Sequence, residues 1–128
     1  MALWGQLNID GSFGPLTREY LQRFLAHQGF YVYAFDGVFG TLSVKALQRY
    51  INEWYYGYHD TTVVVDGVAG PKTWGAWWDF LNHKGYWDGG LVYDSQPIPQ
   101  NIGAGTTRMT QKMLNFYRVN RRVDDPTA

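Results

Sequence analysis

Apolar residues recur at helical spacing along most of this chain. Leu16, Tyr20, Leu21, Phe24 and Leu25 follow one another every three or four positions, which places them on one face of a helix. The same spacing continues in a second segment with Leu42, Ala46, Leu47, Tyr50, Ile51 and Trp54. A last helix is expected over residues 106–117, with Met109, Met113, Leu114 and Tyr117 as its buried face. The pattern predicts an all-α fold, a small helical bundle.

A short loop sequence recurs three times, before the two helices named first and before a further helix expected to begin at Pro71. Asp10-Gly11-Ser12-Phe13-Gly14 returns as residues 36–40, Asp-Gly-Val-Phe-Gly, and as residues 66–70, Asp-Gly-Val-Ala-Gly. Asp-Gly is typical of a tight turn in which the carboxylate accepts backbone N–H bonds and glycine takes a positive φ. Pro15 and Pro71 follow the second glycine and suit a first helical position. Structural turn or cap roles are therefore predicted for Asp10, Gly11, Gly14, Asp36, Gly37, Gly40, Asp66, Gly67 and Gly70.

A longer repeat is also present. Residues 24–31, Phe-Leu-Ala-His-Gln-Gly-Phe-Tyr, match residues 80–87, Phe-Leu-Asn-His-Lys-Gly-Tyr-Trp, after 56 positions (24 to 80). Gly29 and Gly85 are expected to end their helices as C-terminal cap glycines. We predict a single module over residues 1–128, built from two tandem helix-pair units at 10–65 and 66–119, with a frayed tail at 120–128.

Composition excludes several classes of function. The 128 residues carry 11 Lys and Arg against 11 Asp and Glu, so no net charge favours nucleic acid or an anionic membrane. There is no cysteine, which excludes disulfides and thiolate metal sites. No apolar run is long enough to span a bilayer, and the first residues lack the pattern of a signal peptide. We expect release by lysis or export within a larger chain.

Catalytic and metal-binding patterns are weak. The chain has two glutamates, Glu19 and Glu53, and no evident acid pair for glycoside cleavage or nucleophile elbow. Each Asp-Gly loop has a single acidic residue, too few for calcium. His27, His59 and His83 lack zinc spacing, and two of them are better interpreted as residues at helix ends. The expected protein is not an enzyme and has no metal or cofactor.

Aromatic residues are the candidate binding groups, since flat rings stack on the C–H faces of sugars. Trp74 and Trp78 lie four residues apart and therefore share one helix face. They are expected either to form a platform for a ligand or to pack between the two units. Four further aromatics crowd one helix end, and others lie in the linkers, while an arginine would suit carboxylates on a ligand. Gln22, Arg23, Gln48 and Arg49 are interpreted as solvated helix residues, although Arg49 is kept as a candidate contact for a ligand carboxylate. The remaining candidate ligand-binding residues are Trp54, Tyr55, Tyr56, Tyr58, Tyr31, Tyr33, Trp87 and Arg49.

The repeated loop resembles the peptidoglycan-binding domains attached to bacterial and phage cell-wall hydrolases. Their pattern, a Leu-Gln helix followed by Asp-Gly-x-Phe-Gly-Pro-x-Thr, is matched by Leu21-Gln22 and by residues 10–17. The second half matches less well, since Trp78 stands in place of the glutamine. The resemblance implies a non-catalytic module that binds peptidoglycan or an attached wall polymer and acts at the bacterial cell wall. It also implies a covalently tethered catalytic domain, as in phage endolysins.

Two alternatives stay open at this point. The first is a phage or envelope assembly protein that binds a protein partner through exposed aromatics. The second is a stand-alone wall hydrolase. A nucleic-acid-binding role is disfavoured, because the small basic cluster at Arg118, Arg121 and Arg122 is offset by Asp124 and Asp125.

Overall fold

The computed structural model describes residues 2–59, 63–86 and 102–123, and its regular secondary structure in these ranges is helical. The helices are α1 (Pro15–His27), α2 (Thr41–His59), α3 (Pro71–His83) and α4 (Ala104–Asn120). The predicted all-α bundle is confirmed. The last helix is longer than the expected 106–117 at both ends: it begins at Ala104, directly after Gly103, and ends at Asn120.

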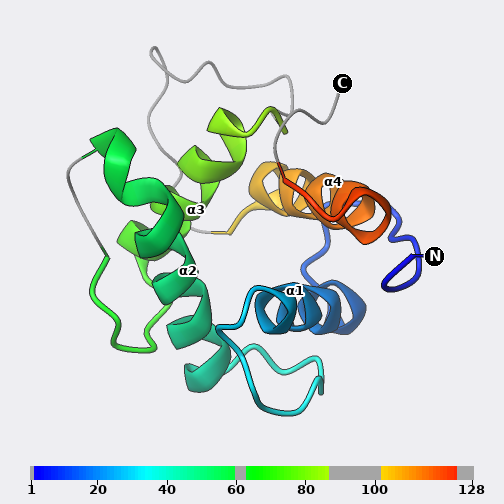
Figure 1. Cartoon of the computed structure of the whole chain (residues 1–128), viewed down its shortest axis with the longest axis horizontal. Helices are drawn as coiled ribbons and strands as arrows, with labels where there is room; N and C mark the ends of the chain where they lie inside the picture. Colours follow the sequence, from blue (N-terminus) through cyan, green and yellow to red (C-terminus); the bar gives the residue numbers. More distant parts are fainter. Residues whose placement is uncertain (1, 60–62, 87–101, 124–128) are drawn as a thin grey trace.

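The four helices close into a ring in which each packs on the next and α4 packs back on α1. Figure 1 shows α1 lying beside α4 and α2 beside α3. Gln111, in the middle of α4, contacts Thr17 near the beginning of α1, and Tyr117 contacts His27 near the ends of the same two helices. Gln22 of α1 contacts Ser43 at the beginning of α2, and Gln48 of α2 contacts Thr73 at the beginning of α3. Three of the helices thus begin beside the middle of a neighbouring helix.

One hydrophobic core is shared by all four helices. Phe24 of α1 lies edge-on to Tyr50 of α2 at 5.2 Å between ring centroids and to Tyr117 of α4 at 4.8 Å. Tyr50 in turn contacts Phe80 of α3 at 5.4 Å. Because this core runs across the division expected between residues 65 and 66, the helix pairs are not separately packed. The structural repeat is one loop with the helix that follows it.

A buried glutamine ties each of three helices to the loop that precedes the next helix. Gln48 of α2 places its Nε2 within hydrogen-bonding distance of Asp66 Oδ1 (3.0 Å), Val68 O (3.2 Å) and Thr73 Oγ1 (3.0 Å). Its Oε1 accepts the N–H groups of Asp66 (3.1 Å) and Gly67 (3.0 Å). We name this arrangement the glutamine clasp. A single side chain thereby satisfies donors and acceptors of a tight turn that backbone bonds alone leave unmet.

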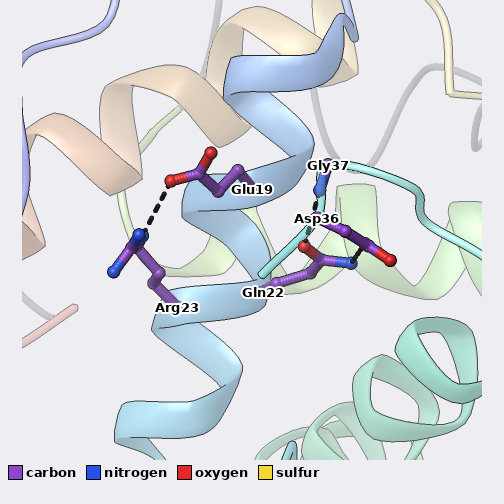
Figure 2. Close-up of polar contacts among 5 residues, drawn as sticks. All are labelled: Glu19, Gln22, Arg23, Asp36 and Gly37. Carbon is purple, nitrogen blue, oxygen red and sulfur yellow. Dashed lines mark hydrogen bonds and ion pairs between the residues drawn. The ribbon is translucent and has the colours of Figure 1, made fainter. Parts of the chain in front are cut away.

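The same clasp recurs at Gln22 and Gln111. Gln22 donates to Asp36 and accepts the Gly37 N–H, as Figure 2 shows. Its Nε2 also donates to Val38 O and Ser43 Oγ. Gln111 of α4 reaches back to the first loop, at Asp10, Ser12 O and Thr17, and accepts the Gly11 N–H. The interpretation of Gln22 and Gln48 as solvated is wrong, since their exposed fractions are 0% and 1%. Gln111 was missed by the sequence reasoning.

The Asp-Gly turns have the predicted conformation. Gly11, Gly37 and Gly67 have φ values of 75°, 74° and 77°. At Gly37 a β-carbon would lie 2.9 Å from the carbonyl oxygen of Pro15, so glycine is needed for close approach as well as for its φ. The second glycine of the loop is the N-cap residue, as Gly14 before α1 and Gly70 before α3 show, and Gly40 O accepts the Val44 N–H in α2.

The helix ends and linkers also follow the repeat. At Gly29, φ is 89° and the Phe30 N–H donates to Leu25 O, which completes a Schellman motif; Gly85 has the same geometry. These two cap predictions are confirmed. Asn115 pairs with both backbone groups of Leu7 (2.7 and 2.9 Å), and this fixes the N-terminal segment along α4.

The interface between α3 and α4 departs from the pattern. Trp78 occupies the position of the clasping glutamines and is buried in the core. Instead, Trp77 Nε1 donates to Thr110 Oγ1 at 2.9 Å. The residues expected to fray, 120–128, lie only partly within the described range, which ends at 123.

Removing a clasp should destabilise the fold strongly. We expect Gln48→Ala to lower the free energy of unfolding by about 3 kcal/mol, because it removes the partner of the buried Thr73 hydroxyl and of the part-buried groups of the turn, and a buried unsatisfied group costs about 1–3 kcal/mol. Chemical denaturation followed by circular dichroism measures this. The matched control is Arg49→Ala, the exposed neighbour, expected to change stability by less than about 0.5 kcal/mol. A similar, small loss in both variants would contradict the role given to the clasp.

Candidate functional site

The tryptophan pair proposed as a ligand platform belongs to the core. Trp74 and Trp78 have exposed fractions of 7% and 2%, so neither offers a ring face to a ligand. Trp74, the fourth residue of α3, packs against Phe13 (5.7 Å between centroids) and Phe39 (6.3 Å). Of the two interpretations left open by the sequence, a stacking platform is wrong and packing between repeats is what the structure shows. The physical reason is the large apolar area that two exposed indoles would leave in water.

The remaining predicted aromatics divide into three groups. Tyr31 is buried and its hydroxyl donates to Ala34 O at 2.7 Å, so its predicted ligand contact is also wrong. Tyr33 is exposed, and so is Arg49. Residues 54–59 belong to the backbone of α2, but their side chains lie outside the described part of the structure, and so does the whole of Trp87. The candidates concerned are Trp54, Tyr55, Tyr56, Tyr58 and Trp87.

One exposed aromatic surface does form around Tyr33. Tyr33 and Phe35 are exposed to 52% and 38%, and Val32 beside them is also exposed. The Arg23 guanidinium lies over the Phe35 ring, 4.7 Å from its centroid, and its Nε is 2.9 Å from Glu19 Oε2. We name the group Val32, Tyr33, Phe35, Arg23 and Glu19 the linker patch. Figure 2 shows the side chains of Glu19 and Arg23 directed toward each other from successive turns of α1.

The linker that carries the linker patch is anchored to the bundle by packing contacts before it and by a hydrogen bond after it. On one side, Phe30 packs edge-on against Tyr50 at 6.0 Å, and the Tyr31 ring is buried. On the other side, Gly37 is held by the clasp of Gln22. Residues 32–35 span the interval between these points and are exposed. The linker therefore presents its side chains on a rigid support, which lowers the conformational cost of binding.

The chemistry of the linker patch is that of a shallow sugar- or peptide-binding surface. An exposed tyrosine ring can stack on a sugar face or an apolar side chain. The adjacent Arg23–Glu19 pair supplies N–H donors and carboxylate oxygens for hydroxyl, amide or carboxylate groups. Sequence reasoning selected Tyr33 but missed Phe35 and Arg23. Their signal was positional: Phe35 directly precedes an Asp-Gly turn, and Arg23 directly follows a clasping glutamine.

The described residues contain no group of three or more His, Cys, Asp or Glu side chains arranged to hold a metal ion. Asp10, Asp36 and Asp66 each use Oδ1 to accept the N–H of the residue two positions later, at 2.9–3.0 Å. His27 Nδ1 lies 2.6 Å from the Tyr117 hydroxyl near the end of α1. His83 Nδ1 lies 3.1 Å from Asp79 O in the last turn of α3. These contacts give both histidines a structural place at a helix end.

The turn hydrogen bonds also set the acidity of the three aspartates. The N–H of Ser12 and then the Gln111 amide lower the pKa of the Asp10 carboxyl below its ordinary value of 3.8. Val38 and Gln22 lower the pKa of Asp36, and Val68 and Gln48 lower that of Asp66, in the same order of effect. Each carboxylate is therefore favoured in its ionised form first by the turn N–H and then by the clasping glutamine.

Comparison of this chain with protein-family models, with curated proteins and with solved structures finds no match. The family resemblance thus depends on the loop and helix residues already named. No helix in the described parts of the chain has the length and apolar character needed to cross a membrane.

Stability should fall in acid because of the three turn aspartates. Their folded pKa values lie below the unfolded value, so their contribution is present above about pH 4 and is lost as the pH falls through the folded pKa values. Urea unfolding at pH 6 and pH 3 is expected to show a lower midpoint at pH 3. In Asp36→Asn the difference between the two pH values should shrink. An equal difference in wild type and variant would exclude Asp36 as a contributor.

Proposed function

We propose that this chain is a non-catalytic module that binds peptidoglycan or an attached wall polymer and holds a tethered hydrolase, of the phage endolysin kind, at the bacterial cell wall. The observation that carries the proposal is the linker patch. It places two exposed aromatic rings beside an arginine–glutamate pair, on a linker fixed by the same loop motif that resembles the family.

The proposed mode of binding uses stacking and polar contacts together. The ring of Tyr33 would stack on a sugar or on an apolar part of a stem peptide. The Arg23–Glu19 pair would contact hydroxyl, amide or carboxylate groups of the same ligand. A surface of this size supports a weak, reversible contact, and a repeating polymer with a tethered enzyme converts weak contacts into a high local concentration.

A role without catalysis fits the placement of the glutamates. Glu19 is engaged with Arg23 at 2.9 Å, and Glu53 is exposed on α2. The described aspartates of the loops accept backbone N–H bonds.

A second candidate is an assembly protein that binds a protein partner. The observation in its favour is that Val32 and Val38, on the same linker and loop, are exposed and apolar. Such residues suit the apolar centre of a protein interface better than a sugar. This candidate predicts a defined complex or oligomer and no affinity for cell walls.

Co-sedimentation with insoluble sacculi tests the first proposal. The double variant Tyr33→Ala/Phe35→Ala should bind about tenfold more weakly than wild type, equivalent to a loss of about 1.4 kcal/mol. The matched control, Val64→Ala/Val119→Ala, removes two exposed apolar side chains elsewhere and should bind as wild type. Circular dichroism of each variant checks folding.

Three outcomes of this experiment decide between the candidates. Absence of wild-type protein from the pellet with walls of several bacterial classes would exclude the wall-binding role. A defined oligomer in sedimentation velocity would then favour the assembly role. Loss of turbidity when the chain alone is added to walls would show that the module is a hydrolase.

A further inference from the structure

The linker patch contains a continuous row of side-chain contacts. The Tyr33 ring lies 5.6 Å from the Tyr31 ring, and the Tyr31 ring lies 6.2 Å from the Phe35 ring, measured between centroids. The Arg23 guanidinium follows, with its Cζ 4.7 Å from the Phe35 centroid. Tyr31 is buried and its hydroxyl donates to Ala34 O, so it fixes the middle of the row. An aromatic ring and a polar pair are thereby presented together on one surface.

The two exposed rings of the patch have different surroundings. Phe35 has the Arg23 guanidinium over its ring and the Tyr31 ring tilted beside it. Tyr33 is exposed to 52% and meets Tyr31 in an edge contact, with the two rings at 66°. Tyr33 is therefore the ring that can stack on a ligand, whereas Phe35 positions the guanidinium through a cation–π contact.

The arginine–glutamate pair keeps most of its hydrogen-bonding capacity. Arg23 Nε donates to Glu19 Oε2 at 2.9 Å, and within the described ranges the pair makes no other hydrogen bond. The Nη donors of Arg23 and the Oε1 acceptor of Glu19 therefore remain for a ligand, and the two side chains are 40% and 29% exposed. A secondary amide, with one C=O acceptor and one N–H donor, matches such neighbouring donors and acceptor.

The charges around the pair favour a neutral ligand over an anion. Glu19 offsets the charge of Arg23, and Asp36 adds a further carboxylate at the end of the linker. Arg18, the basic neighbour of Glu19 in the sequence, lies over the Phe13 ring instead. These groups give the patch no excess positive charge with which to hold a carboxylate or a phosphate. An uncharged amide is therefore the best-matched polar group.

The equivalent positions of the next repeat carry a different combination. On α2, Arg49 occupies the position that Arg23 has on α1, directly after a clasping glutamine. Lys45 stands in place of the glutamate, and Val65 stands in place of the phenylalanine. That surface has two basic side chains and an aliphatic one instead of a basic–acidic pair and a ring. It therefore provides a matched control within the same fold.

We propose that the linker patch recognises an acetamido sugar, an N-acetylated amino sugar within an oligosaccharide. Tyr33 stacks on the C–H face of the sugar ring, Arg23 Nη donates to the acetamido C=O, and Glu19 Oε1 accepts the acetamido N–H. The exposed, apolar Val32 beside Tyr33 suits the acetamido methyl group. The cell wall as the source of this sugar rests on the proposed function, whereas affinity for a free oligosaccharide does not.

Two trisaccharides test the proposal on the full chain. N-acetylchitotriose and cellotriose share their linkage and differ in carrying an acetamido group or a hydroxyl group on each ring. Titration of ¹⁵N-labelled protein with the acetylated sugar should give saturable shifts of the Tyr33 amide and of Arg23 Nε. Cellotriose, which lacks the amide, should bind about tenfold more weakly.

Single substitutions separate the stacking ring from the polar pair. Arg23→Ala should lower the affinity for N-acetylchitotriose about tenfold, to that for cellotriose, because only the acetylated sugar uses the guanidinium. Tyr33→Ala should weaken the binding of both sugars by the same factor, since stacking does not depend on the acetamido group. Arg49→Ala, the matched control on α2, should leave both affinities unchanged. Circular dichroism checks that each variant is folded.

The outcomes distinguish the site from the proposed function. Equal affinities of the wild-type chain for the two trisaccharides would overturn the acetamido assignment, and so would an unchanged preference in Arg23→Ala. Saturable binding of an acetylated dipeptide amide, with none of N-acetylchitotriose, would overturn the sugar and assign the patch to a peptide. A preference for the acetylated sugar without any binding to sacculi would support the site and exclude the wall-binding role. Binding to sacculi that is equal in wild type and Arg23→Ala would leave the wall-binding role standing and overturn the use of the acetamido contact there.

Discussion

The fold depends on a buried side-chain amide that serves two elements at once. A glutamine carries two N–H donors and a carbonyl acceptor, so one side chain can satisfy both the amides and the carbonyl of a tight turn. Gln22, Gln48 and Gln111 each do this for the loop before the neighbouring helix. An apolar residue in the same place would leave those turn groups buried without partners, at a cost comparable with much of the stability of a small domain.

The clasps also account for how the helices follow one another around the ring. Each glutamine is the eighth residue of its helix and contacts the loop that starts the neighbouring one, so that neighbour begins beside the middle of the glutamine's helix. One side chain thereby places both the turn and the helix that follows it.

The sequence specified the helices, the Asp-Gly turns and the helix caps, because these depend on neighbouring residues. It did not reveal the clasps, since a glutamine between apolar helix positions looks solvated until its partner loop is known. The 12-residue interval from Asp10 to Gln22 and from Asp36 to Gln48 was visible, but the true partners are Asp36 and Asp66. Burial of Trp74 and Trp78 and closure of Gln111 onto Asp10, a contact across 101 residues, likewise depend on the assembled ring.

Scaffold and candidate binding surface use different residues of the same repeat. The clasp fixes Gly37 while leaving residues 32–35 exposed, so the chemistry of the linker patch can change without disturbing the turn. The α3–α4 interface has no such glutamine, because Trp78 stands at that position. The Trp77–Thr110 hydrogen bond and additional apolar packing hold these two helices together. Three polar clasps and one apolar interface thus suffice to close the ring. The exposed linker residues, which the core does not constrain, are consequently where binding is best sought.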